Sequence, residues 1–214
     1  MTVPSGLYAI TPDALVDDDA RLMTAVAAAL RGGASLIQYR DKRSDAARRH
    51  ANAAALNALC REAGALLVIN DDTALAAAVG AAGVHLGASD GSLAAARAQL
   101  GPDAVIGATC GNSLERARAA VAAGASYVAF GRFFASKTKP DAPPAELATL
   151  AAAHAALDAP ICAIGGLTPD NLGPVARSGA TLIAAIDGVF GAADIEAAAR
   201  AYVAAIGGQT ARIP

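Results

Sequence analysis

Short apolar runs recur along the chain, and longer stretches between them repeat apolar residues every three or four positions. The short runs predict eight strands, at residues 6–10, 35–39, 65–69, 83–86, 104–108, 126–130, 160–164 and 181–186. Most of these runs are apolar at consecutive positions, which is typical of parallel strands that are buried on both faces.

The longer stretches predict amphipathic helices, most clearly at residues 18–31, 44–63, 113–123 and 194–206. A Gly-Ala pair follows several of them, as at Gly64-Ala65 and Gly124-Ala125. Glycine just past a helix supplies the left-handed cap that turns the chain into the next strand. Eight strand–helix units favour an α/β fold, a single (β/α)8 TIM barrel, over the alternative of an open doubly wound sheet.

Composition agrees with one barrel and narrows the partners. The 214 residues suit a single domain over 1–214, and a chain that is 55% hydrophobic but only 4% aromatic must fill its core with small aliphatic side chains. The net charge is −2 and no long run of Lys and Arg is present, so we expect no nucleic-acid partner. Neither a targeting segment nor a membrane span is evident, so we expect no membrane partner and a cytoplasmic protein.

The three cysteines are Cys60, Cys110 and Cys162, each in an apolar segment. Their number and spacing fit neither a zinc site nor a disulfide framework, and small buried hydrophobes are the more ordinary interpretation. The sequence is compatible with a homo-oligomer but does not set the oligomeric state.

Polar residues gather after the strands, where a barrel of this type binds ligands. Gln38, Arg40 and Lys42 alternate along one strand end, so their side chains could point inward together and grip an anionic ligand. A solvated strand end is the plainer interpretation of the two cations.

Asp71 and Asp90 follow neighbouring strands, and two carboxylates without His or Cys favour Mg²⁺ over zinc. Asp72 is expected to cap the next helix instead.

Two further loops suit phosphate groups. Residues 136–139 read Ser-Lys-Thr-Lys, and Gly165-Gly166 and the turn after Ile186 can offer backbone N–H groups. His85 lies inside a strand, and we interpret it chiefly as a core histidine with satisfied hydrogen bonds.

Taken in order, these motifs closely resemble the thiamine-phosphate synthase family, from about Leu7 to Ala205. The matching segments are Gln38-x-Arg40-x-Lys42, Ile69 to Asp72, His85 to Gly87 with Asp90, Ile106 to Thr109, Gly131 to Lys139, and Ala163 to Gly166.

The resemblance implies a role for each residue. The pyrimidine diphosphate would be held by Gln38, Arg40, Lys42, Asn70, Thr109 and Lys139, with Arg40, Lys42 and Lys139 acting on the leaving group. Asp71 and Asp90 would hold Mg²⁺. The thiazole phosphate would be held by Ser136, Thr138, Gly166, Ile186 and Asp187.

The implied reaction joins a pyrimidine diphosphate to a thiazole phosphate and releases pyrophosphate, through a pyrimidine cation. It needs no nucleophile or base from the protein, and the sequence offers no convincing pair. Departures from the family pattern are Ala88, Arg132, Ala135, Ser136 and Asp187. Two alternatives are a thiazole tautomerase of the same fold and a non-catalytic protein that binds phosphate ligands.

Overall fold

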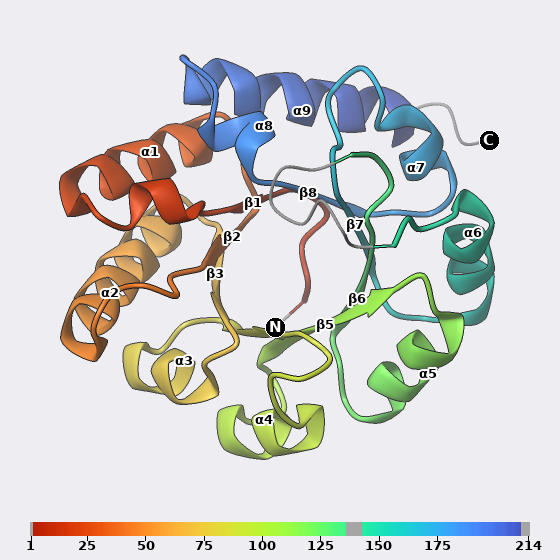
Figure 1. The fold of residues 1–214 in the computed structure, drawn as a ribbon, viewed down its shortest axis with the longest axis horizontal. Helices are drawn as coiled ribbons and strands as arrows, with labels where there is room; N and C mark the ends of the chain where they lie inside the picture. The colour runs from red at the N-terminus through yellow and green to blue at the C-terminus, as the bar shows by residue number, and fades with distance from the viewer. Residues whose placement is uncertain (1, 136–142, 211–214) are drawn as a thin grey trace.

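Eight parallel strands close into a barrel in the computed structural model, which describes residues 2–135 and 143–210. The strands are β1 (Gly6–Ile10), β2 (Leu36–Tyr39), β3 (Leu66–Asn70), β4 (Gly83–Leu86), β5 (Val105–Gly111), β6 (Tyr127–Phe130), β7 (Ile161–Ile164) and β8 (Leu182–Ala185). Each strand pairs with the next along the chain, and β8 pairs with β1. The predicted TIM barrel is therefore confirmed, and Figure 1 shows the helices arranged around it.

Helices follow the strands and form the outer layer. They are α1 (Asp19–Arg31), α2 (Ala46–Glu62), α3 (Thr73–Val79), α4 (Leu93–Leu100), α5 (Leu114–Ala122), α6 (Leu147–Ala156), α7 (Gly173–Arg177), α8 (Asp187–Phe190) and α9 (Ile195–Thr210), with a 3-10 turn η1 at Asp13–Leu15. Several begin at a side chain that accepts an N–H of the first turn, as Asp72 does for α3 and Ser113 for α5. Within the described residues, no helix is long and apolar enough to cross a membrane.

Two apolar cores lie on the two faces of the sheet. The larger core fills the space between strands and helices, whereas a smaller one occupies the barrel interior and includes Tyr8, Val105, Tyr127 and Cys162. Alternation along each strand produces this division, so Tyr39 faces the helices while its neighbour Gln38 faces the interior.

The strand boundaries agree with the sequence predictions to within a residue or two, except in β5. That strand continues through Thr109 to Gly111, because Thr109 and Gly111 still pair with Ala129 and Phe130 of β6. A register shift between Thr109 and Gly111 marks a bulge. Thr109 consequently lies in the strand itself, and an irregular strand end is common beside a functional site.

Candidate active site

The two cations after β2 diverge toward the two neighbouring strands. Arg40 extends past β1, where its Nη1 lies 2.7 Å from Asp13 Oδ1, and Lys42 extends to β3, where its Nζ lies 3.0 Å from Asp71 Oδ2. Gln38 faces the interior as the alternation predicted, whereas Arg40 and Lys42 lie beyond the end of β2 at Tyr39, where the period of two no longer applies. The cations thus span the mouth of the barrel at β1, β2 and β3.

Asp71 has the only positive φ, 63°, among the non-glycine residues that the structure describes. Its backbone N–H donates to the His85 carbonyl of β4 at 2.9 Å, and the Asn70 side chain donates to its carboxylate. Such a backbone conformation is uncommon outside glycine and concentrates at functional sites. The turn directs the Asp71 carboxylate toward Lys42.

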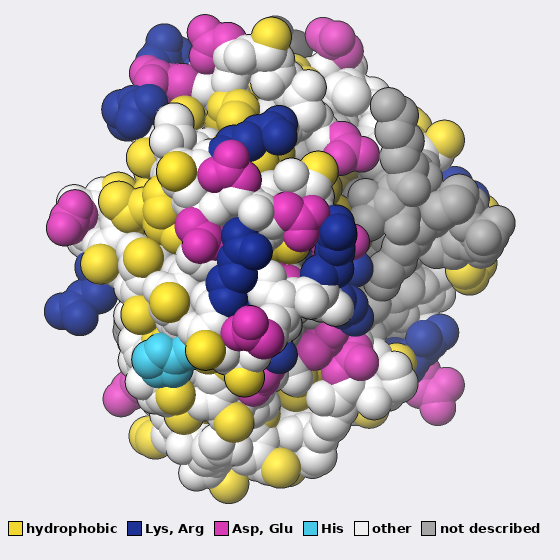
Figure 2. All heavy atoms as spheres, turned by 60° about the vertical axis from the view of Figure 1, so that its left-hand side comes forward, with side chains coloured by type: hydrophobic (Ala, Val, Ile, Leu, Met, Phe, Trp, Pro, Cys, Tyr) yellow, Lys and Arg dark blue, Asp and Glu magenta, His cyan; other side chains and the backbone are white. Residues whose placement is uncertain are grey.

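A cavity of about 340 Å³ opens beside this turn. It is lined by Asp41, Lys42, Arg49, Asn70, Asp71, Asp72 and Thr73. Arg49 of α2 closes its outer side, with Nη2 at 2.7 Å from Asp72 Oδ2, and the Arg49 Nε is buried without a partner among the described residues. Figure 2 shows basic and acidic side chains interleaved on this side of the molecule.

Asp90 lies in an exposed turn after β4, where its Oδ2 accepts the Gly87 N–H at 3.1 Å. Asp71 lies after the neighbouring strand, and both offer carboxylate oxygens at the same end of the sheet. This donor set fits Mg²⁺, which typically takes one or two carboxylates and completes its shell with water and phosphate oxygens. Within residues 2–135 and 143–210, no group of three or more His, Cys, Asp or Glu side chains could hold a metal ion.

Thr109 and His85 meet at the floor of the mouth. The Thr109 Oγ1 lies 2.9 Å from His85 Nε2, and His85 Nδ1 lies 2.8 Å from the Tyr127 hydroxyl. His85 is only 9% exposed, so the interpretation as a satisfied core histidine is confirmed. Its hydrogen bond to Thr109 connects it to a residue predicted to bind the pyrimidine, and the sequence interpretation did not anticipate this connection.

The loops after β6 and β7 are hydrogen-bonded to each other. The Phe134 N–H donates to the Gly165 carbonyl at 3.0 Å, and a side chain at Gly165 would overlap Arg132. Gly166 has a φ of 63°, and its carbonyl accepts the Asn171 side-chain amide at 3.0 Å. The glycine pair therefore allows the two loops to pack closely. Ser136, Thr138 and Lys139 lie outside the described residues.

Ile186 and Asp187 lie where β8 passes into α8. Ile186 is the N-cap of this short helix, and Asp187 is its first residue and is exposed. No side chain caps α8, and none of the described residues forms a hydrogen bond or ion pair with the Asp187 carboxylate. The carboxylate thus neither caps the helix nor pairs with Arg132 within the described part of the chain.

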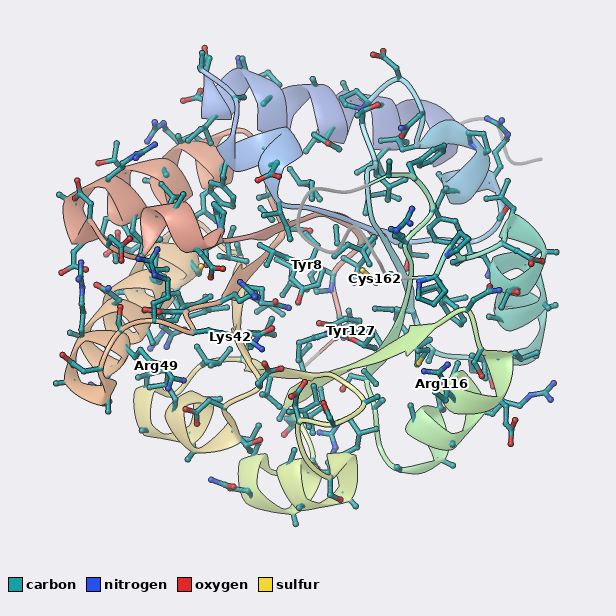
Figure 3. The ribbon with its side chains drawn as sticks, viewed as in Figure 1. Tyr8, Lys42, Arg49, Arg116, Tyr127 and Cys162 are labelled. Atoms are coloured by element: carbon teal, nitrogen blue, oxygen red, sulfur yellow. The ribbon has the colours of Figure 1, made fainter. Side chains whose placement is uncertain are left out.

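Sequence interpretation missed four residues that support the site: Tyr8, Asp13, Arg49 and Tyr127. Tyr8 and Tyr127 meet in the middle of the barrel, while Lys42 and Arg49 lie toward α2 and α3 (Figure 3). The tyrosines could have been found, because each occupies an inward position of its strand and a buried hydroxyl requires a partner. Asp13 and Arg49 act through contacts distant in sequence, which local patterns do not encode.

Known proteins share both this sequence and this structure. The family described as thiamine monophosphate synthase matches residues 7–189. A thiamine-phosphate synthase of Chromobacterium violaceum is 58% identical over 92% of this chain and 93% of its own, and one of Saccharophagus degradans is 52% identical over 89% and 88%. A thiamine phosphate pyrophosphorylase structure from Pyrococcus furiosus superposes with a TM-score of 0.86 at 33% identity, covering 95% of this chain and 96% of its own. The chain therefore belongs to the thiamine monophosphate synthase family.

Proposed function

We propose that this protein is a thiamine-phosphate synthase. It joins 4-amino-2-methyl-5-hydroxymethylpyrimidine diphosphate to 4-methyl-5-(2-hydroxyethyl)thiazole phosphate and releases pyrophosphate. The observation that carries the proposal is the arrangement at the mouth of the barrel in a chain of this family: Lys42 and Asp71 pair on the edge of the cavity, and Arg40, from the same loop, pairs with Asp13 after β1. The free, buried cysteines suit a reducing compartment, and we place the enzyme in the cytoplasm.

In this reaction, the main role of the protein is to stabilise charge. The bond between the exocyclic carbon and the diphosphate oxygen breaks, and its electron pair leaves with pyrophosphate. The thiazole nitrogen then donates its lone pair to the pyrimidine cation and forms the new C–N bond. Arg40, Lys42 and Lys139 would stabilise the negative charge that develops on the leaving group. Mg²⁺ held by Asp71 and Asp90 would supply further positive charge there.

Binding residues complete the assignment. Gln38, Asn70 and Thr109 would position the pyrimidine, and the backbone at Gly166, Ile186 and Asp187, with Ser136 and Thr138, would hold the thiazole phosphate. The ion pairs Arg40–Asp13 and Lys42–Asp71 support this assignment, because each holds its cation near the mouth before the ligand arrives. No proton transfer is assigned to the protein.

The tautomerase alternative needs an acid–base group over the thiazole. The segment after Thr109 offers Cys110 and Asn112, and burial raises the pKa of the Cys110 thiol to about 11. The thiol is therefore protonated near neutral pH and is a poor base. This observation favours the synthase.

One incubation tests the proposal. Purified protein is mixed with both substrates and Mg²⁺, and thiamine phosphate and pyrophosphate are measured together. We expect equal amounts of both products. Isomerised thiazole phosphate without pyrophosphate would identify a tautomerase, and ligand binding without any product would identify a binding protein.

A further inference from the structure

Five polar side chains form a continuous hydrogen-bonded chain across the barrel interior. Gln38 Nε2 lies 2.5 Å from the Tyr8 hydroxyl, which lies 2.9 Å from the Tyr127 hydroxyl. From Tyr127 the chain continues through His85 to Thr109, by the two contacts of 2.8 and 2.9 Å already described. Its two ends, Gln38 and Thr109, are both residues assigned to the pyrimidine.

The interior is built around this chain. Gln38, Tyr8, Tyr127 and His85 are each at most 9% exposed, so none can exchange its partner for bulk water at low cost. A side chain at Gly107 would overlap both the Tyr127 ring and His85 Nδ1. Glycine at 107 therefore keeps open the space in which tyrosine and histidine meet.

Counting donors and acceptors gives a direction to this row of hydrogen bonds. The Gln38 amide N–H donates to Tyr8, so the Tyr8 hydroxyl keeps its own hydrogen for another acceptor. Among the described residues that acceptor is the Tyr127 oxygen, and the Tyr127 hydroxyl must then donate to His85 Nδ1. The opposite direction would leave the Tyr8 hydrogen buried without an acceptor, which is costly.

The direction determines what the two ends offer. His85 accepts at Nδ1 and so carries its hydrogen on Nε2, which donates to Thr109 Oγ1. The Thr109 hydroxyl thereby keeps its hydrogen for a ligand. At the other end, the contact with Tyr8 uses one N–H of the Gln38 amide, so the Gln38 carbonyl oxygen stays available as an acceptor.

We propose that Tyr8, Tyr127 and His85 are positioning residues that fix the donor and acceptor polarity of the pyrimidine pocket. Thr109 presents a donor and Gln38 an acceptor, a pattern that suits a ring with an acceptor nitrogen and an amino group. An oxo analogue of the pyrimidine reverses both groups and is rejected. This inference rests on the proposed function for the identity of the ligand, but the polarity of the chain belongs to the protein alone.

The first test determines the direction of these hydrogen bonds in the protein without substrate. ¹⁵N NMR of histidine-labelled protein reports which ring nitrogen of a neutral histidine carries hydrogen, and the chain has three histidines. His50→Gln and His154→Gln assign the other two signals, and the remaining one belongs to His85. We expect hydrogen on Nε2 of His85, and hydrogen on Nδ1 would overturn the proposal. The outcome does not depend on whether the protein is a synthase.

The second test removes the hydrogen bonds at the centre of the row of five polar side chains. Tyr127→Phe should raise the KM for the aminopyrimidine diphosphate about tenfold and leave the thiazole phosphate KM unchanged. It should also reduce the ratio of the affinity for the amino substrate to the affinity for the oxo analogue. The affinity for the analogue is measured as its inhibition constant. Tyr202→Phe is the control, since this buried tyrosine donates to the Leu167 carbonyl outside the chain and should leave the pyrimidine KM unchanged.

The outcomes separate the two ideas. If the wild-type protein forms no thiamine phosphate, the proposed function fails while the His85 measurement still decides the polarity. If the wild type is active and Tyr127→Phe keeps both its pyrimidine KM and its preference for the amino substrate, the positioning role is wrong. Should Tyr127→Phe fail to fold, Tyr8→Phe interrupts the same row of hydrogen bonds between Gln38 and Tyr127 and should change the pyrimidine KM and the preference in the same directions.

Discussion

Single charged residues at the mouth of the barrel are held in pairs that can open. The Lys42 side chain is 54% exposed and pairs with an Asp71 carboxylate that is 24% exposed. An ion pair this exposed contributes about 1 kcal/mol or less, because water and salt screen it. The proposed diphosphate and Mg²⁺ could therefore replace both partners of this ion pair at a small energetic cost.

Replacing Asp71 tests the metal assignment. Asp71→Asn retains a residue that tolerates positive φ, so it removes the charge with little strain, whereas Asp71→Ala also removes the polar group. We expect both variants to stay folded and to lose Mg²⁺-dependent turnover by roughly 100-fold or more, the usual effect of losing stabilisation of developing charge.

Thermal unfolding shows whether each variant is folded, and the turnover rate measured at increasing Mg²⁺ concentration shows its response to the metal. Asp17→Ala is the control, because Asp17 also forms an ion pair, with Arg43, at a more exposed position outside the site. Near-normal turnover with an unchanged Mg²⁺ response in folded Asp71→Asn would rule out Asp71 as a metal ligand.

Asp187 is the least expected residue beside a phosphate. A carboxylate about 4 Å from a phosphate is repelled by roughly 1 kcal/mol even in a watery setting. The exposed position of Asp187 in the first turn of α8 leaves room for the carboxylate to point to solvent, while the backbone N–H groups would face the proposed phosphate. Asp187→Ser should therefore leave the thiazole phosphate KM unchanged or slightly lower, with the pyrimidine KM unchanged. A large rise in the thiazole phosphate KM alone would mean that the carboxylate contacts the substrate.

At the scale of helices and strands, close contacts between elements fix where the mouth of the barrel lies. Helix α1 ends against α9 at Gly32, where an added Cβ would lie 2.5 Å from Ala199 Cβ and 2.6 Å from the Glu196 carbonyl oxygen. These two helices flank the joint between β8 and β1 that closes the barrel. Separation of α1 from α9 would disturb both Asp13 after β1 and Asp187 after β8.

Two glycine substitutions test this packing with opposite signs. Gly32→Ala should destabilise the fold by about 1–3 kcal/mol, as overpacking does. Gly207→Ala, inside α9 with open space around it, should stabilise it by up to about 1 kcal/mol through helix propensity. Urea unfolding measures both free energies, and a stabilising Gly32→Ala would show that the helices adjust without cost.

Sequence patterns predicted the strands well because each strand is a short apolar run between polar or glycine-containing segments. They also placed Gln38, Asn70, Asp71 and Thr109 near the mouth, since parallel strands all end on one side. The patterns did not predict that Arg40 turns to Asp13 and Lys42 to Asp71. Those contacts depend on residues distant in the chain, and alternation no longer applies once β2 ends at Tyr39.

For the molecule as a whole, the barrel interior combines an apolar core with a polar chain. Burial raises the pKa of Tyr8 and of Tyr127 well above the ordinary value for tyrosine, so both hydroxyls stay protonated and can donate. Their rings also meet edge to face, with centroids 6.0 Å apart. Tyr8 is in β1 and Tyr127 in β6, so this contact joins strands that are not neighbours in the sheet.

A double-mutant cycle on these tyrosines tests whether the polar chain contributes to the stability of the whole barrel. Tyr8→Phe and Tyr127→Phe each retain the ring but leave a buried partner without its hydrogen bond, so each should destabilise the fold. In the double variant the two remaining rings leave no hydroxyl stranded between them. We therefore expect it to be more stable than the sum of the single effects by about 0.5–3 kcal/mol, the range found for residues in contact. Urea unfolding of the four proteins gives this coupling, and a matched cycle on Tyr8 and Tyr202 should give none, because Tyr202 bonds to Leu167 outside the barrel interior. Additive effects in the first cycle would mean that the two hydroxyls stabilise the barrel independently.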